Sequence, residues 1–528
     1  MKSFPSRTRA TVAVAVAALC LAGCGSGSGG SGDTKYATGA TFTLAEAADP
    51  GSLDPQAGAG SSLIQMNALA YDSLVAVDAK GTILPQLASS WTVDGTTATF
   101  TIKSGITCAD GAAFTAQTVV DNITYVENPE SKSPLLGAFI PVGVTASASG
   151  STVTLTLAKP SPFLLSSLAN LPMVCDKGMK DRSTLKSGTD GTGPFTLSQA
   201  SPGDQYTYTV RSGYTWGAGG ASTAAAGTPA KIVVKIIANE TTAANTLLAG
   251  QINAARIVGT DRTRLAGAGI ASSSTPLLLG QQWYNQAAGH PTSDPQVRLA
   301  LTEALDFGQL QKVLTANLGS AATQLAVLPP AGCQGDSVTG HVPATNVADA
   351  KAKLAAAGWT AGADGILAKD GKKLSLTMLY DSALGAGASA AAELLTSQWK
   401  AIGVEVTTKS QATAAMQGVM FGTGAWDVVW EALNVNTPDQ LVAFLSGPAA
   451  PNGTNFAGIN NATYTAAAAK AATKNGAAGC DDWLAAEAAL FQAADVVPFA
   501  NSQIPIFYKG ATLSQTGTIL PMSIKMLG

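Results

Sequence analysis

Charged side chains and histidines are scarce in this sequence. Only 12% of its 528 residues are Asp, Glu, Lys or Arg, and the two histidines are His290 and His341. The formal net charge is −3 and the lysines and arginines are scattered, so the chain lacks the basic surface with which proteins bind nucleic acid. The histidines and cysteines have no zinc-finger-like spacing, so we predict no metal site and no other cofactor.

Long hydrophobic runs are also rare. Residues 10–22 form an almost unbroken apolar run, and no later run is long enough to cross a bilayer. Hydrophobic residues still make up 46% of the chain, which favours a folded globular body over a disordered one. Because 528 residues exceed what one hydrophobic core usually holds, we expect two or three lobes.

The start of the chain has the features of an export signal. Lys2, Arg7 and Arg9 supply positive charge, and the apolar run that follows is too short to span a bilayer stably. Small residues stand immediately before Cys24. This arrangement resembles the lipobox of bacterial lipoproteins, in which the cysteine becomes the mature N-terminus and carries lipid. A secreted leader with an accidental cysteine is the alternative.

The lipobox resemblance implies a signal peptide over residues 1–23 and lipidation at Cys24, with more than one acyl chain, palmitate among them, holding the protein at the cell membrane. Residues 24–36 begin with an unbroken run of glycine and serine. Such a composition predicts a flexible tether without a folding role.

Four cysteines are left for the folded body once the leader is removed and Cys24 is lipidated. An even number of cysteines in an exported chain favours structural disulfides over a metal site. The four cysteines are Cys108, Cys175, Cys333 and Cys480. They can form two disulfides in three different pairings.

Short strands and helices alternate along both halves of the body. Alternating or β-branched residues predict strands at 41–44, 97–103, 153–157 and 231–237, with late strands at 497–499 and 504–508. Helical spacing of apolar residues predicts helices at 63–74, 241–249, 295–314, 388–401 and 483–494. This alternation indicates α/β lobes with mixed sheets.

Several phrases in the body keep a common order. They are Tyr71–Val75 with Leu84–Ala88 and Trp91, Ala98–Ile102 with Asp110, Gly111 and Phe114–Ala116, Gly191–Phe195, Val297–Leu301 with Asp306, and Ala357–Trp359. Together they resemble the solute-binding proteins of bacterial peptide and nickel ABC importers, the family often called family 5. The chain departs from the family at Gln251 and Asn253, where the family has an acidic pair.

The resemblance implies an α/β, two-lobed fold like that of periplasmic binding proteins (type II), with an extra subdomain in the first lobe. The implied division is lobe I over 37–278 with the subdomain over about 76–186, lobe II over 279–496, and a return to lobe I over 497–528. Within this division we favour the disulfides Cys108–Cys175 and Cys333–Cys480, because each pair then lies within one lobe.

The implied function is capture without catalysis. The chain would be a monomeric, extracytoplasmic protein of the periplasmic space or cell surface, and not an enzyme. It would bind a peptide or other small-molecule ligand between closing lobes and deliver it to an ABC permease for transmembrane transport.

The candidate ligand-binding residues match contact segments of the family. They are Gly60, Ser61, Ser62, Trp283, Tyr284, Asn285, Trp426, Trp430, Glu431 and Asn434. Alternatives remain open: a tryptophan in a strand also suits the core, a serine also caps a helix, and Glu431 also suits a solvated lip.

Peptide-binding relatives hold the ligand ammonium with an aspartate, and that position falls here at Leu433 or Asn434. Either Glu431 or Asp439 substitutes for it, or the ligand is not a short free peptide, because burying an unpaired ammonium is costly.

Two other functions compete with an importer protein. An exported hydrolase would need a nucleophile and base, yet no Gly-x-Ser-x-Gly elbow is present. A lipoprotein that senses a solute for some other partner would have the same fold, since function depends on the site and its partners.

Overall fold

The computed structural model describes residues 35–58 and 60–528. The expected signal peptide, Cys24 and nearly all of the expected tether lie outside the described residues. The chain divides into two units, Met1–Lys35 and Tyr36–Gly528, and the described strands and helices lie in the second. Among the described residues, no helix combines the length and hydropathy that crossing a membrane requires.

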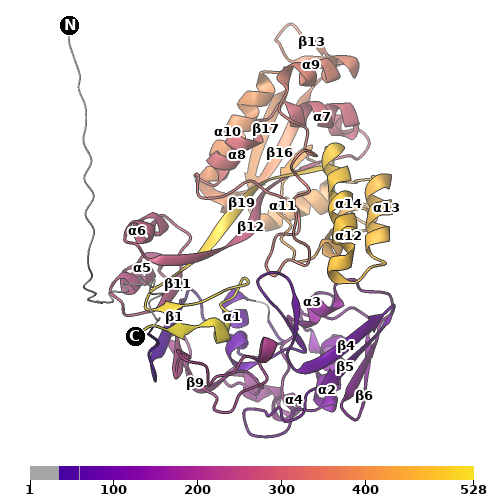
Figure 1. The fold of residues 1–528 in the computed structure, drawn as a ribbon. Coiled ribbons are helices and arrows are strands. Elements are labelled where there is room, and N and C mark those ends of the chain that lie inside the picture. Colours follow the sequence, from indigo (N-terminus) through magenta and orange to yellow (C-terminus); the bar gives the residue numbers. More distant parts are fainter. Residues whose placement is uncertain (1–34, 59) are drawn as a thin grey trace, which may run out of the picture. The chain divides into compact units, whose positions relative to one another are not determined.

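One mixed sheet of ten strands runs through this unit in the order β17-β16-β18-β12-β19-β11-β1-β10-β9-β8. Its strands are β1 (Thr41–Glu46), β8 (Phe195–Ser201), β9 (Gln205–Val210), β10 (Lys231–Ile236), β11 (Ala254–Arg256), β12 (Ala271–Tyr284), β16 (Ser375–Asp381), β17 (Glu405–Gln411), β18 (Val428–Trp430) and β19 (Val496–Tyr508). We call the part built on β8–β11 and β1 lobe I, and the part built on β16–β18 lobe II. The long antiparallel pair β12 and β19, here called the ribbon, joins them (Figure 1).

Lobe I buries both faces of its parallel strands. On β1, Phe42 and Leu44 pack in one cluster with Met66 of α1, whereas Ala45 belongs to a second cluster with Leu247 of α5. The alternation of the strand therefore feeds two separate cores. The helices of this lobe are α1 (Ser61–Ala70), α4 (Asp176–Lys180), α5 (Glu240–Leu248) and α6 (Asp261–Gly267), and the short strands β20 (Ala511–Thr512) and β21 (Lys525–Met526) lie near the C-terminus.

Lobe II repeats this arrangement. On β16, Met378 joins a cluster with Leu301 and Trp399, and the next residue, Leu379, joins a cluster with Trp483 on the other face. The helices are α7 (Pro295–Glu303), α8 (Phe307–Leu314), α9 (Val347–Ala356), α10 (Gly385–Lys400), α11 (Thr413–Gly418), α12 (Val442–Leu445), α13 (Ala462–Ala471) and α14 (Cys480–Gln492), and a small sheet contains β13 (Thr360–Ala361), β14 (Leu367–Lys369) and β15 (Lys372–Lys373).

A separate four-stranded sheet lies between β1 and β8 in the sequence, in the order β4-β5-β7-β6. Phe100 on β5, Ile123 on α2 and Leu164 on α3 share its hydrophobic cluster. We call this sheet and its helices the four-stranded layer. Its elements are β4 (Ala88–Asp94), β5 (Thr97–Ile102), β6 (Thr145–Ser149), β7 (Thr152–Thr156), α2 (Ala116–Glu127) and α3 (Leu164–Leu168), preceded by the hairpin β2 (Val75–Val77) and β3 (Ile83–Pro85).

Two of the predicted helices differ most from the bounds in the structure. The helix predicted over 295–314 is two helices, because Asp306 leaves the helical path and its side chain caps α8 through the backbone N–H of Gln309 at 2.9 Å. The helix predicted over 63–74 ends at Ala70, since Asp72 is drawn into a buried network in which Thr192 and Tyr214 donate to its carboxylate at 2.9 Å each.

The two strands predicted over 497–499 and 504–508 are one continuous strand, β19, because it pairs along its length with β12. The structure also contains the two disulfides favoured from the sequence, Cys108–Cys175 and Cys333–Cys480.

The buried carboxylate of Glu487 on α14 binds the segment between α8 and α9. Glu487 accepts a hydrogen bond from Ser337 Oγ at 2.6 Å and from the backbone N–H of Leu325 at 3.2 Å. Burial outweighs these bonds and raises the pKa of Glu487 to about 7 from an ordinary value of 4.5. The folded chain therefore holds this proton more tightly than the unfolded chain does.

This proton makes stability depend on pH. As pH rises through the window from 4.5 to 7, the folded state must give up a proton that the unfolded state has already lost, so the free energy of unfolding falls. We expect the wild type to lose about 2–3 kcal/mol more between pH 5 and pH 8 than Glu487→Gln does. Urea denaturation of both proteins at the two pH values measures the difference, and equal losses would contradict it.

Candidate functional site

In each lobe, the strand that pairs with the ribbon runs toward the middle of the ribbon. In lobe II, β18 ends at Trp430 opposite Gln282 and runs on toward lower-numbered residues of β12. In lobe I, β11 ends at Arg256 opposite Ile506 and runs on toward lower-numbered residues of β19. Both courses lead to the same stretch, residues 274–281 of β12 with their partners on β19. Open α/β sheets bind ligands beyond the carboxyl ends of parallel strands, so this stretch is the candidate site.

At the lobe II edge, Glu431 follows β18 directly. Its backbone N–H donates to the Gln281 carbonyl at 3.1 Å, and its carbonyl accepts from Trp283 Nε1 at 2.7 Å. The carboxylate, in contrast, has no hydrogen-bond or ion-pair partner within the described part of the chain. Asp381 ends β16 one position beyond the Tyr380–Trp430 pair, which places the two acidic residues at neighbouring strand ends.

Burial and the negative charge of Asp381 together raise the pKa of Glu431 to about 7. A half-buried carboxylate beside a second acid is destabilised in its charged form, and a cation arriving at the site would relieve that cost. The lobe II edge is therefore suited to a ligand group that carries positive charge.

At the lobe I edge, Glu46 and Arg256 end the neighbouring strands β1 and β11. Ser62, in the first turn of α1, donates through Oγ to Glu46 at 2.9 Å. Burial raises the pKa of Glu46, although the Ser62 bond and the charge of Arg256 act in the opposite direction. Gly60 and Ser61, which precede Ser62 in the sequence, are exposed. This edge offers hydroxyl, backbone and charged groups to a solute.

The structure buries the four predicted aromatic residues. Trp283 and Tyr284 are 0% exposed, and Trp426 and Trp430 are 1% exposed. The rings of Trp283 and Trp426 pack on Phe456, with centroids 4.8 and 6.0 Å away. In this structure these side chains contact the cores of lobe II on both faces of the sheet.

Trp430 and Tyr284 are also satisfied internally. Trp430 Nε1 donates to Gln282 Oε1 at 3.1 Å, and its ring lies 5.4 Å from that of Phe499. The Tyr284 hydroxyl accepts from Gln282 Nε2 at 2.7 Å. These partners place both residues in packing and polar networks beneath the ribbon.

The two predicted asparagines hold backbone. Asn434 accepts from the Leu278 N–H at 2.8 Å and donates to the Leu278 carbonyl at 3.0 Å, which fixes the segment after β18 to the ribbon. Leu278 adjoins an irregularity in the β12–β19 register. Asn285 Nδ2 donates to the Trp426 carbonyl at 2.9 Å. Both side chains therefore position the edge of the site.

Three charged residues of the site escaped the sequence analysis: Glu46, Arg256 and Asp381. Each is the last residue of a strand that points toward the ribbon. The sequence did contain a signal, because a charged residue after an apolar strand marks the end of that strand. The sequence does not show which strands pair with one another, so it could not place these ends near the ribbon. In the described residues, the structure contains no group of three or more His, Cys, Asp or Glu side chains able to hold a metal ion.

Residues 82–454 match the family described as bacterial extracellular solute-binding proteins, family 5 Middle. The chain belongs to this family. The family 5 chain is 26% identical over 496 residues to the periplasmic murein peptide-binding protein MppA of Escherichia coli (strain K12), covering 85% of each chain. It is 27% identical over 408 residues to the nickel-binding periplasmic protein of the same organism, covering 74% of each.

Solved structures share the fold. The unliganded open form of MppA matches with a TM-score of 0.76 at 22% identity, over 94% of this chain and 99% of that one. HbpA2 from Haemophilus parasuis matches with a TM-score of 0.78 at 19% identity, over 92% and 99%. The family 5 fold is thus a two-lobed α/β binding-protein fold, as the sequence motifs predicted, and the relatives are binding proteins and not enzymes.

Two adjacent substitutions separate a packing role from a ligand role. Trp430→Ala removes a buried ring and should lower the free energy of unfolding by about 3–5 kcal/mol. Glu431→Gln removes a half-buried charge that is destabilised in the folded chain, so at pH 8 it should raise the free energy of unfolding or leave it unchanged, and should not lower it. Urea denaturation measures both. An unchanged stability in Trp430→Ala would contradict its placement in the core.

Proposed function

We propose that this family 5 protein is the extracytoplasmic solute-binding lipoprotein of an ABC importer. Lobe I, over 37–278 with a return over 497–528, and lobe II, over 279–496, close on one solute at the ribbon. The subdomain of lobe I covers about residues 76–186. The protein then presents the closed form to a membrane permease, without altering the solute. The convergence of both sets of strand ends on the ribbon supports this proposal.

The attachment to the membrane is part of the proposal. Removal of residues 1–23 leaves Cys24 as the lipid-bearing N-terminus, and residues 24–36 tether the body. A tethered monomer keeps the captured solute close to the permease, which raises the effective concentration of the two partners for each other. The composition of the leader and the tether supports this step.

The solute is a peptide or peptide-like compound with a cationic group. Glu431 takes that group, because its carboxylate is half-buried, has a raised pKa and has no counter-charge among the described residues. Asp381 adds a second negative charge at the neighbouring strand end. Ser61, Ser62 and the backbone at Gly60 contact the other end of the solute from lobe I. The relative MppA, named for binding murein peptide, is compatible with this class.

Native mass spectrometry of the protein isolated from its own host tests the proposal. We expect one small organic solute per chain, bearing an amine or another cationic group and chemically unaltered. The lobes exclude water when closed, and a ligand held from both sides dissociates slowly.

Glu431→Gln is the variant to compare with the wild type, because it keeps the shape of the side chain and removes its charge. It should retain at least about tenfold less solute, which is the loss expected from one charge-assisted contact. Equal retention by the variant would refute the role of Glu431, and conversion of the solute would favour a hydrolase.

A further inference from the structure

A single phenylalanine of the four-stranded layer is buried inside lobe II. Phe163 precedes α3 and is 2% exposed, yet it belongs to the hydrophobic cluster of lobe II that contains Trp283, Leu325 and Trp483. Its ring centroid lies 6.3 Å from that of Trp483. The next residue, Leu164, packs in the core of the four-stranded layer. One chain segment thus contributes to the cores of two parts of the protein.

Lobe II has a socket shaped for this ring. A Cβ placed on Gly332 would lie 2.9 Å from two ring carbons of Phe163 and 2.7 Å from Thr437 Cγ2, so only glycine leaves room for the ring. The disulfide between Cys333 and Cys480 fixes the Gly332 segment to the start of α14. We call Gly332, Cys333, Thr437 and Trp483 the socket.

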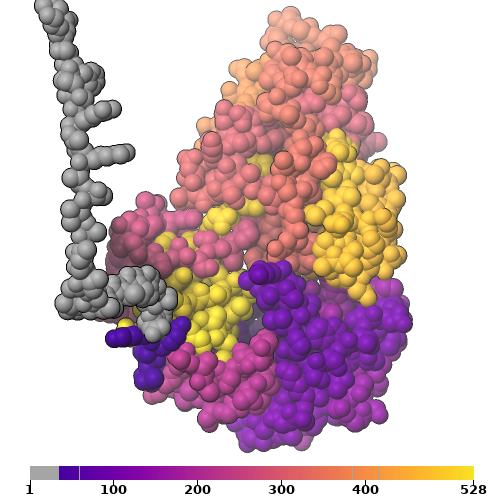
Figure 2. Space-filling model, viewed as in Figure 1, coloured from indigo at the N-terminus to yellow at the C-terminus, as the bar shows by residue number. Residues whose placement is uncertain are grey.

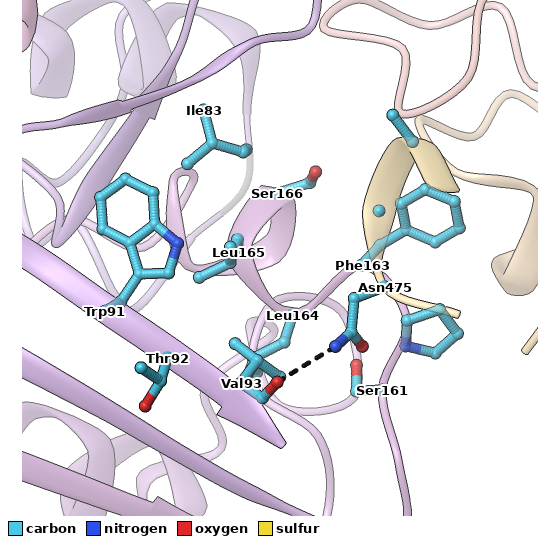
Figure 3. A pocket seen from close by; sticks show the side chains of 13 residues that line it. Ile83, Trp91, Thr92, Val93, Ser161, Phe163, Leu164, Leu165, Ser166 and Asn475 are labelled. Carbon is cyan, nitrogen blue, oxygen red and sulfur yellow. Dashed lines mark hydrogen bonds between the residues drawn. The ribbon is translucent and has the colours of Figure 1, made fainter. Parts of the chain in front are cut away.

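Two hydrogen bonds among the described residues join the two parts beside the ring. The Gly476 N–H donates to the Pro162 carbonyl at 2.8 Å, and Asn475 Nδ2 donates to the Val93 carbonyl at 3.2 Å (Figure 3). No ion pair among the described residues crosses this contact. Among the described residues, Phe163 is the side chain of the four-stranded layer that packs in the hydrophobic cluster of lobe II.

The packing around the ring is incomplete. A hollow of about 380 Å³ lies beside it, between Trp91 and Leu165 of the four-stranded layer and Asn475 of lobe II (Figure 3). Figure 2 shows the turn of α13 and α14 meeting the four-stranded layer at this face. Permanent interfaces are packed as densely as protein interiors, so a lone ring beside a hollow indicates a contact that separates.

We propose that Phe163 is a latch for the clamp motion of the proposed function. The ring enters the socket when the lobes close and leaves it when they open, so its fit sets how much of the solute-free protein is closed. The four-stranded layer is separate from the ten-stranded sheet that contains the ribbon. The latch gives this layer a role in solute capture. Because the latch is apolar, salt should affect it little.

Hydrogen exchange on the solute-free chain tests the latch directly. The Gly476 amide reports the contact, because its proton is bonded to Pro162, whereas the Asp495 amide, bonded to Leu490 at 2.9 Å, reports lobe II itself. In Phe163→Ala we expect exchange at Gly476 to accelerate at least tenfold with Asp495 unchanged. Small-angle scattering of the same chain, with Cys24→Ser to avoid lipid, should show a larger radius of gyration.

Gly332→Ala fills the socket from the other lobe and should produce the same two changes. The double variant should resemble either single variant, because both remove one contact, whereas Phe163→Leu should give a smaller change. An unchanged radius of gyration, or additive effects in the double variant, would overturn the latch. Solute retention in the wild type is measured separately, so failure of the latch leaves the proposed function standing.

Discussion

The pairing of β12 with β19 determines how the two lobes are held together. The two strands are hydrogen-bonded from Ala271 and Tyr508 at one end to Trp283 and Val496 at the other, so both lobes share one backbone ladder. Each lobe buries its own strands of the shared sheet on both faces, and the ladder joins these strands into one sheet. A ladder broken by irregularities beside Gly280 can bend without losing its pairing at either end.

The site follows from the direction of the strands. Since β11 and β18 pair with the ribbon in antiparallel fashion, their carboxyl ends approach its middle from opposite lobes. Charged residues at those ends are half-buried before any solute arrives. Desolvation therefore acts on Glu46 and Glu431 in the free protein, and a solute with complementary charge recovers part of that cost on binding.

Local pattern predicted much of the fold. The strands at β1, β5, β7 and β10 follow from alternation or β-branched runs, and their observed bounds differ from the expected ones by only one or two residues. The ordered motifs predicted the two-lobed architecture, and the disulfides follow from it. Helix capping was harder to predict from local pattern. Asp306 lies between α7 and α8 and caps α8, and Gln398 of the distant helix α10 accepts its backbone N–H at 3.0 Å.

The site was harder to predict than the fold. Glu431 and Ser62 were predicted because they lie in segments that match contact segments of the family. Glu46 and Arg256 at one edge, and Asp381 at the other, are placed only by strand register. The tryptophans illustrate the same limit. A tryptophan in a strand suits a core more often than a ligand wall, and the partners of Trp430, namely Gln282 and Phe499, place this one in the core.

We propose that a solute binds where both sets of strand ends meet the ribbon. A structure of the protein with its co-purified solute tests this most directly. We expect the solute to lie against residues 274–281, with a cationic group at Glu431 and contacts from Ser61 or Ser62. A solute held instead in the hollow between Trp91 and Asn475, away from Glu431, would contradict it.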